Sequence, residues 1–343
     1  MSTLGIMHGK RGGGIKLYDE EGNEIKLAGK GLKISFTAAN DKAYYDAEVE
    51  LKNEVLPNFT DTSIYKYGIM IEHKGKCHYI GAGINGRNHY IMDLNKNTSN
   101  LSFTQINNSP INTLSYVTGI SYDNKLHIFF SNLHYTWDEV QDTWTEIETL
   151  PFYITGLCKT VIYDDEINIL GNIAGSKWGH RRLNKETSAW NSITVPSNLQ
   201  YEIWVGLQPA VATEYGIYYM GGNICRYTKS GGWVRLDDQS ISKYPSDTSI
   251  YLWRRWAVSI GNTIFAGFDD VESISKTTNS TFNWTTIEYS QDGTTTHRAV
   301  NYAFAYNKAI YTFSMTFDQN EAFIRTTRQL SIYHPKVYMQ VKY

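Results

Sequence analysis

Hydrophobic residues along the chain come in short runs separated by polar turns, and Gly119–Pro151 shows this pattern most clearly. Its first apolar run reaches a turn at Asp123–Lys125, and a second run, Leu126–Phe130, follows directly. Two further runs contain Trp137 and Trp144. Short β-branched and aromatic runs between Asn, Asp and Lys turns are typical of strands joined by hairpins. The stretch therefore predicts four short antiparallel strands.

The same unit is repeated along the chain, and two independent markers locate the repeats. The predicted second strand starts at intervals of 41 to 50 residues, at Lys76, Lys125, Glu166, Gly216, Asn262 and Lys308. A large apolar residue of the predicted fourth strand recurs with nearly the same period, at Phe103, Trp144, Trp190, Trp233, Trp284 and Leu330. Four strands in a unit of this length are typical of β-propeller blades. We predict an all-β chain with a six-bladed β-propeller over residues 59–343 and a small N-terminal β extension over residues 1–58.

The units resemble the Kelch repeat, which combines an apolar run, a Gly-Gly pair and a hairpin of the form Tyr-Asp-x-x-Thr-x-x-Trp. Asn184–Trp190 and Asn95–Thr98 are similar to this hairpin, and Gly221–Gly222 is an intact glycine pair. The resemblance covers roughly residues 60–335 and implies a Kelch-like propeller. It implies no particular activity, because this fold carries enzymes, lectins and scaffolds alike.

The first 58 residues lack both markers and are predicted to form a separate element. A hairpin is expected around the turn Glu21–Asn23, and Pro57–Asn58 is the expected boundary with the propeller. Three basic residues precede the hairpin, in a stretch of 18 residues that is predicted to dock to a partner: Lys10, Arg11 and Lys16. The final alternating run, Val337–Val341, is expected either to close the propeller or to pair with the N-terminal extension.

Charge and cysteine content narrow the range of functions. The 32 basic and 34 acidic residues nearly balance, so a nucleic-acid or membrane-surface role has no electrostatic support. Cys77, Cys158 and Cys225 are odd in number and lie in or beside predicted strands, which predicts buried thiols rather than a disulfide framework. No apolar run has the length of a membrane helix, and Met1–Gly5 starts no signal-peptide core. We therefore expect neither membrane insertion nor Sec secretion.

The predicted strand order places the longer loops on one face of the propeller, where binding residues are commonly found. These loops are expected over Gly83–His89, Asn172–His180, Asp237–Trp253, Asp269–Thr281 and Gln291–His297. Within and beside them, tryptophan and arginine side chains are suited to stacking on sugar rings or binding acidic groups. The candidate ligand-binding residues are Trp178, His180, Arg181, Trp253, Arg254, Arg255, Trp256 and His297. The alternative is packing, with one tryptophan of the Trp253–Trp256 segment anchoring a blade start as Tyr116, Tyr153 and Trp204 are expected to do.

Catalytic patterns are weak, and we predict a non-enzymatic protein without metal or cofactor. Ser290–Thr294 resembles a sialidase Asp-box but is one residue short between Asp and Gly, and it occurs once. His78 and His127 occupy the same second-strand position in successive units, which favours packing over metal binding.

The composition, rich in Asn, Ile, Lys and Tyr, is typical of AT-rich bacterial or phage genomes. A Kelch-like propeller behind a small glycine-rich β segment resembles tail or fibre proteins of bacteriophages and phage-like particles. The resemblance implies a virion tail protein, made in the host cytoplasm and present in several copies. Its N-terminal segment would dock to other tail proteins, and its loop face would bind a host cell-surface glycan or protein. Two alternatives remain open, a purely structural tail, baseplate or decoration protein and a bacterial carbohydrate-active enzyme.

Overall fold

The chain is an all-β protein whose strands form several antiparallel sheets, with one short helix, α1 (Ser197–Gln200), in the described part. The computed structural model describes residues 17–18, 24–25, 33–34, 52–56, 68–83, 86–96, 102–111, 116–174, 176–200, 210–220, 224–236, 256–267, 273–278, 285–288, 298–306, 309–317, 323–331 and 340–341. The chain divides into two compact units. One comprises Met1–Glu48 with His334–Tyr343, and the other comprises Val49–Tyr333 and is called the body below.

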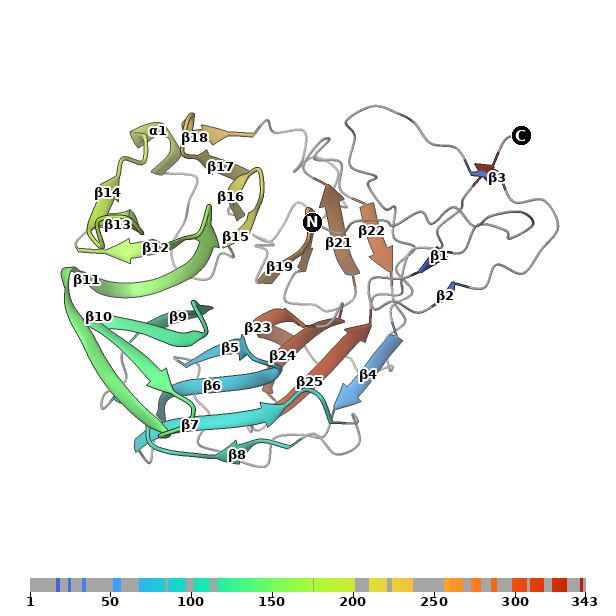
Figure 1. Cartoon of the computed structure of the whole chain (residues 1–343), viewed down its shortest axis with the longest axis horizontal. Helices are drawn as coiled ribbons and strands as arrows, with labels where there is room; N and C mark the ends of the chain where they lie inside the picture. Colours follow the sequence, from blue (N-terminus) through green and yellow to red (C-terminus); the bar gives the residue numbers. More distant parts are fainter. Residues whose placement is uncertain are drawn as a thin grey trace, which may run out of the picture. The chain divides into compact units, whose positions relative to one another are not determined.

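The strands that follow residue 68 form first a four-stranded sheet and then a six-stranded sheet (Figure 1). The four strands of the first sheet are β5 (Ile69–His73), β6 (Lys76–Gly83), β7 (Gly86–Asp93) and β8 (Thr104–Gln105). The six strands of the second are β9 (Val117–Tyr122), β10 (Lys125–Asp138), β11 (Thr143–Tyr163), β12 (Glu166–Ile173), β13 (Ser176–Leu183) and β14 (Trp190–Ile193). In both sheets, strands that follow one another in the chain are hydrogen-bonded neighbours.

Three more four-stranded sheets complete the body. The first consists of β15 (Ala210–Thr213), β16 (Gly216–Met220), β17 (Ile224–Thr228) and β18 (Gly232–Arg235). The next consists of β19 (Trp256–Ile260), β20 (Thr263–Gly267), β21 (Ser273–Thr278) and β22 (Thr285–Glu288). The last consists of β23 (Arg298–Tyr306), β24 (Ala309–Phe317), β25 (Phe323–Ser331) and, from the other end of the chain, β4 (Lys52–Leu56).

The predicted second-strand starts are confirmed. β6, β10, β12 and β16 begin at the predicted residue, and β20 and β24 begin one residue after it. Tight turns set these starts, since Asp123 and Asn124 have φ values of 48° and 58°, and Asp164 and Asp165 have 53° and 58°. Two successive positive φ angles are the type I′ geometry that matches the twist of a hairpin, and Asn and Asp tolerate it.

The second and third predicted units share one sheet, because β11 serves both of them. β11 continues through Pro151, the last residue of the stretch from which the unit was first described. Pairing between β10 and β11 is interrupted between Leu133↔Thr149 and Ser131↔Ile154, and Pro151 falls in that interval. A residue without an N–H is tolerated there, because no ladder hydrogen bond is required of it.

The chain also reverses direction inside β10. Nδ1 of His127 and Nε2 of His134 are 2.9 Å apart although seven residues separate them. A straight strand would place these residues about 23 Å apart. The reversal lies near Ser131, whose φ is 53°, so β10 supplies both the second and the third strand of its unit.

The last unit takes its fourth strand from the N-terminal side of the body. Leu330 was predicted in a fourth strand, but it lies in β25, the third strand, and pairs with Asn53 of β4. The predicted boundary at Pro57–Asn58 accordingly differs from the division between Glu48 and Val49. In the compact unit formed by Met1–Glu48 and His334–Tyr343, β1 (Leu17–Tyr18) pairs with β2 (Glu24–Ile25), as the predicted hairpin requires.

The C-terminal run pairs with the N-terminal extension, one of the two outcomes expected for it. β26 (Gln340–Val341) forms a parallel pair with β3 (Lys33–Ile34) in the unit that contains both chain ends.

Two of the expected long loops consist largely of paired strands. β6 and β7 pair up to Gly83↔Gly86, and β12 and β13 pair up to Ile173↔Ser176. The segments Gly83–His89 and Asn172–His180 are therefore mostly strand. The sequence pattern concealed this because both segments carry glycines and polar residues in extended positions.

The first strands of the units are neighbours in a cyclic order. β5 lies beside β9, β9 beside β11, β11 beside β15, β15 beside β19, β19 beside β23, and β23 beside β5 again. Tyr302 of β23 donates a hydrogen bond from its hydroxyl to the carbonyl of Gly68, at 2.5 Å, and so joins the last sheet to the first. The hydrophobic core is distributed between sheets, as in the cluster that joins Cys77 and Met92 to Phe304 and Tyr311.

Because β4 completes the last sheet, fragments that start on either side of it should differ in stability. We expect residues 59–343 to be less stable than residues 49–343 by roughly 3–5 kcal/mol, since the five residue pairs between β4 and β25 are lost. Urea unfolding followed by tryptophan fluorescence measures the difference. Equal midpoints and slopes for the two fragments would show that β4 adds nothing.

Candidate functional site

The structure describes only part of the predicted ligand face. Trp178 lies in β13, but its side chain is outside the described residues. The other predicted site residues outside them are Trp253, Arg254, Arg255 and His297 of the loop face, and Lys10, Arg11 and Lys16 of the docking segment. These residues stay predictions.

Two of the predicted ligand-binding residues are core residues. Trp256 is the first residue of β19 and is 3% exposed, and His180 is 0% exposed. Neither side chain is accessible to a ligand on the surface, so their assignment to the ligand face is corrected. The burial of Trp256 agrees instead with the packing role that one tryptophan of its segment was expected to have.

Arg181 is half-buried and already engaged within the protein. Its guanidinium donates a hydrogen bond to Oγ of Ser192 at 2.9 Å and lies 5.5 Å from the centre of the Phe152 ring. The arginine thus covers a buried aromatic residue of β11, a strand that β12 separates from β13 in the sheet. Such a position leaves part of the cation exposed while fixing its orientation.

An exposed strip on β11 is the best candidate for a binding surface among the described residues. Between positions 149 and 155, side chains alternate between buried and exposed, as a strand with one covered face requires. Leu150, Phe152 and Ile154 are buried. We call the exposed set the β11 strip, and its members are Ile147, Thr149, Pro151, Tyr153 and Thr155.

Two large apolar side chains make the β11 strip unusual. Tyr153 is 56% exposed and Ile147 is 50% exposed. Ile147 lies where the register shifts between His134↔Glu148 and Tyr135↔Glu146, a bulge of the kind that redirects a side chain. Tyr153 and Tyr116 were expected to be packing anchors, and that expectation is wrong because both are exposed. An aromatic ring beside threonine hydroxyls can bind a sugar face or an apolar protein patch.

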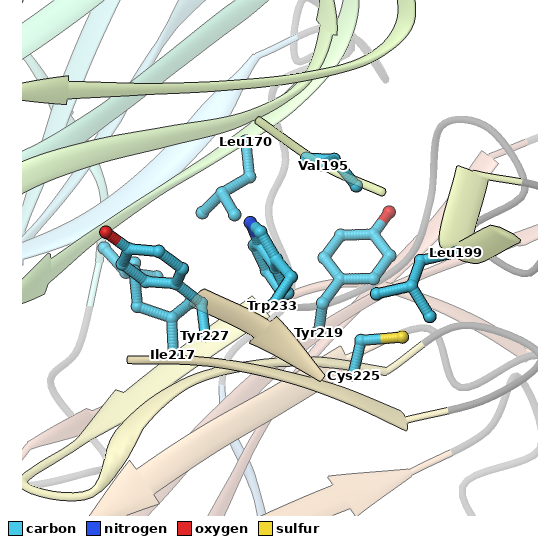
Figure 2. Close-up of a cluster of buried hydrophobic side chains, with 9 residues drawn as sticks. Leu170, Val195, Leu199, Ile217, Tyr219, Cys225, Tyr227 and Trp233 are labelled. Carbon is cyan, nitrogen blue, oxygen red and sulfur yellow. The ribbon is translucent and has the colours of Figure 1, made fainter. Parts of the chain in front are cut away.

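A second cluster, of buried histidines, joins consecutive units. In the third unit, Oδ1 of Asn168 is 2.9 Å from Nε2 of His180, and the indole N–H of Trp233 donates to Nδ1 of His180 at 3.2 Å. A neutral His180 with its proton on Nε2 satisfies both bonds. Trp233 comes from the fourth strand of the next sheet, where it packs with Leu170, Ile217 and Tyr227 (Figure 2). The network therefore connects β12 and β13 to β18.

The second unit has the same arrangement with an acid inserted. Nδ1 of His127 and Nε2 of His134 are 2.9 Å apart, and Nδ1 of His134 is 3.0 Å from Oε1 of Glu148. The indole N–H of Trp190 donates to the same oxygen of Glu148 at 2.9 Å. His127 and Asn168 are equivalent, since each lies two residues after the start of its second strand.

Counting protons shows that this network is one proton short at neutral pH. Nε2 of His127 is also 3.2 Å from the carbonyl of Tyr122, which can only accept. The network contains three contacts: His127 with the carbonyl of Tyr122, His127 with His134, and His134 with the carboxylate of Glu148. Each contact needs one proton on a ring nitrogen to become a hydrogen bond, whereas two neutral imidazoles carry only two such protons. One bond is therefore incomplete until the network takes up a proton.

The first unit has the histidine pair but no completed connection to the next tryptophan. Nδ1 of His78 and Nε2 of His89 are 3.0 Å apart. The rings of His89 and Trp144 lie 5.3 Å apart, yet Nδ1 of His89 and Nε1 of Trp144 have no hydrogen-bond partner among the described residues. Packing dominates at this joint, as expected for His78 and His127.

Burial lowers the pKa of every histidine in these clusters. Desolvation lowers the pKa of His78 to about 2, of His89 and His180 to about 3, and of His127 to about 4. These rings are neutral near pH 7 and unsuited to proton transfer at that pH. Within the described residues, no three His, Cys, Asp or Glu side chains are arranged to hold a metal ion. The three cysteines are free and buried, as predicted.

Comparison with known proteins identifies the fold but no family. No known protein family and no curated protein matches the sequence. The structure of YjhT aligns with a TM-score of 0.55 and 11% identity, covering 80% of this chain and 96% of that one. A protein of unknown function from Dyadobacter fermentans aligns with a TM-score of 0.50 and 10% identity, covering 82% and 99%. At these identities the likeness concerns the fold alone.

The sequence held a signal for the histidine network. The position two residues after each second-strand start contains His78, His127 and Asn168, and the tryptophan marker contains Trp144, Trp190 and Trp233. The third-strand partners His89, His134 and His180 completed the pattern, but their pairing depends on strand register, which the two markers do not specify.

No helix in the described ranges is long and apolar enough to cross a membrane.

Replacing Trp233 by phenylalanine tests the joint between the third unit and the next sheet. Trp233→Phe leaves Nδ1 of the buried His180 without its donor, and we expect a loss of about 1–3 kcal/mol in the free energy of unfolding. Trp144→Phe is the matched control, because its indole N–H has no partner in the described structure. Chemical denaturation measures both, and an equal loss in the two variants would contradict a role for the Trp233 bond.

The buried histidines predict a loss of stability in mild acid. Their folded-state pKa values lie below the unfolded value near 6.5, so the unfolded chain binds more protons and stability falls as pH drops through that value. For His180 alone the expected loss between pH 7 and pH 5 is roughly 2 kcal/mol. Urea unfolding at pH 7 and at pH 5 measures the total loss in the free energy of unfolding from all the buried histidines.

His78→Asn, which copies Asn168 of the third unit, supplies the control. This variant should show a smaller loss between pH 7 and pH 5, because one buried histidine is removed from the proton balance. A stability independent of pH in this range for the unmodified protein would contradict the assignment of neutral buried rings.

Proposed function

We propose that the protein is a non-enzymatic tail protein of a bacteriophage or phage-like particle, whose body binds a host cell-surface glycan or protein. The observation that carries the proposal is the β11 strip, which exposes the side chains of Tyr153 and Ile147 on one strand. Tyrosine is enriched at protein binding surfaces, which supports a recognition role for the β11 strip.

The body is proposed to be a six-bladed Kelch-like β-propeller. The cyclic order of the first strands supports this architecture, as does the fourth strand that β4 contributes to the last sheet. Propellers commonly protect their ends by combining strands from both ends of the chain in one blade. Loops on such a scaffold are held in fixed relative positions, which suits recognition.

The proposed attachment function belongs to the unit formed by both chain ends. Met1–Glu48 and His334–Tyr343 form a compact unit separate from the body, which supports a division of labour between docking and recognition. Several copies on one particle would raise the avidity for a cell surface by roughly 10²–10⁴ over a single weak sugar site. Other tail proteins are the proposed docking partners.

Binding of the fluorescently labelled full-length protein to a panel of bacterial strains tests the proposal. We expect strain-selective binding, about 2- to 12-fold weaker in Tyr153→Ser because an aromatic stacking contact is worth about 0.5–1.5 kcal/mol. Trp253→Ala tests the predicted loop residue in the same way.

The matched control is Val140→Ser. Val140 is 95% exposed but lies in the turn between Asp138 and Thr143, away from the β11 strip, so its replacement should leave binding unchanged. Unchanged binding by both Tyr153→Ser and Trp253→Ala would refute recognition through these surfaces. A folded protein that binds no strain would favour the structural tail role instead.

A further inference from the structure

Lys159 occupies an inner position of the body where a cation is unexpected. It lies in β11 opposite Leu170 of β12. Side chains alternate along a strand, so Lys159 points to the same side as Val161. Val161 packs with Leu170, Ile217 and Tyr219 in the cluster between the third unit and the next sheet. Figure 2 shows the last three of these side chains. Lys159 is therefore directed toward the neighbouring strand β15, which lies beside β11.

The equivalent first-strand positions of the other described units carry no charge. Each equivalent residue pairs with the residue four positions after the second-strand start. These residues are Ile69, Thr118, Trp256 and Tyr302. Neighbouring units are thus packed with uncharged side chains at this position, and a lysine adds nothing that the fold requires there.

The ammonium group of Lys159 has no counter-charge in the described part of the chain. None of the ion pairs there includes it. The adjacent Cys158 is buried, which raises the pKa of its thiol to about 12, so the thiol is neutral. Burial also lowers the pKa of Lys159, although the residue keeps some contact with solvent. An enclosed, unpaired cation is costly unless a ligand compensates it.

We propose that Lys159 binds an anionic group of a ligand, a carboxylate or a phosphate, between the inner strands β11 and β15. A charged acceptor would replace the water that the ammonium group has lost, through a charge-assisted hydrogen bond. Only the third unit carries this lysine, so one such site is expected per chain among the described units. The proposal stands apart from cell binding through the β11 strip, because Lys159 and Tyr153 are on different parts of β11 and are tested by different variants.

Calorimetric titration of the full-length protein with glucuronate, inorganic phosphate and glucose tests the site. Glucuronate or phosphate should bind in a saturable way, while uncharged glucose should not. Binding of glucuronate alone would indicate a carboxylated sugar, and binding of phosphate alone a phosphate-bearing polymer. In Lys159→Met the affinity should fall roughly 10- to 100-fold, the usual value of a hydrogen bond between charged groups.

Lys185→Met is the matched control, because Lys185 is an exposed lysine that already pairs with Asp165. Its anion affinity should equal that of the unmodified protein. Thermal unfolding of Lys159→Met separates binding from folding, since removal of an unpaired enclosed charge should leave the melting temperature equal or higher. The proposal would be overturned if neither glucuronate nor phosphate binds, or if Lys159→Met binds them with the same affinity as the unmodified protein.

Discussion

The body depends on the contact between the faces of neighbouring units. A four-stranded sheet cannot bury enough apolar surface alone, and here each sheet covers the next. The cluster of Val161, Leu170, Ile217 and Tyr219 belongs to two sheets at once. Closure follows from the same requirement, because the first and last sheets would each expose an apolar face if they did not meet. Phe304 and Tyr311 of the last sheet pack on Cys77 and Met92 of the first.

The histidine network constrains the relative orientation of neighbouring units, which apolar contact alone does not. A tryptophan from the fourth strand of one unit reaches the third-strand histidine of the unit before it, directly at His180 and through Glu148 at His134. Apolar packing tolerates sliding and rotation, whereas buried donors and acceptors lose free energy unless they are aligned. The two hydrogen-bonded joints, at Trp190 and Trp233, therefore constrain the angle between the units that they connect. At the first joint the indole N–H of Trp144 has no partner in the described structure, and packing alone holds it.

Sequence periodicity predicted the second-strand starts because each is set locally, by a two-residue turn such as Asp123–Asn124. It failed at Leu330, since the fourth strand of that sheet, β4, comes from the opposite end of the chain. It also failed at Tyr153, because alternation in β11 shows which residues share a face but not which face is covered. Of the predicted ligand residues, His180 and Trp256 are buried for a related reason: aromatic residues that suit sugar binding equally suit the contact between sheets.

The pairing of β4 with β25 also determines how the chain enters and leaves the body. Lys52, at the start of β4, is paired with Ser331, at the end of β25. The two connections to the unit of Met1–Glu48 and His334–Tyr343 therefore leave the body from adjacent positions on one edge strand and its neighbour. The same pairing thus completes the last sheet and holds two segments from opposite ends of the body in register, at residues 52–56 and 327–331.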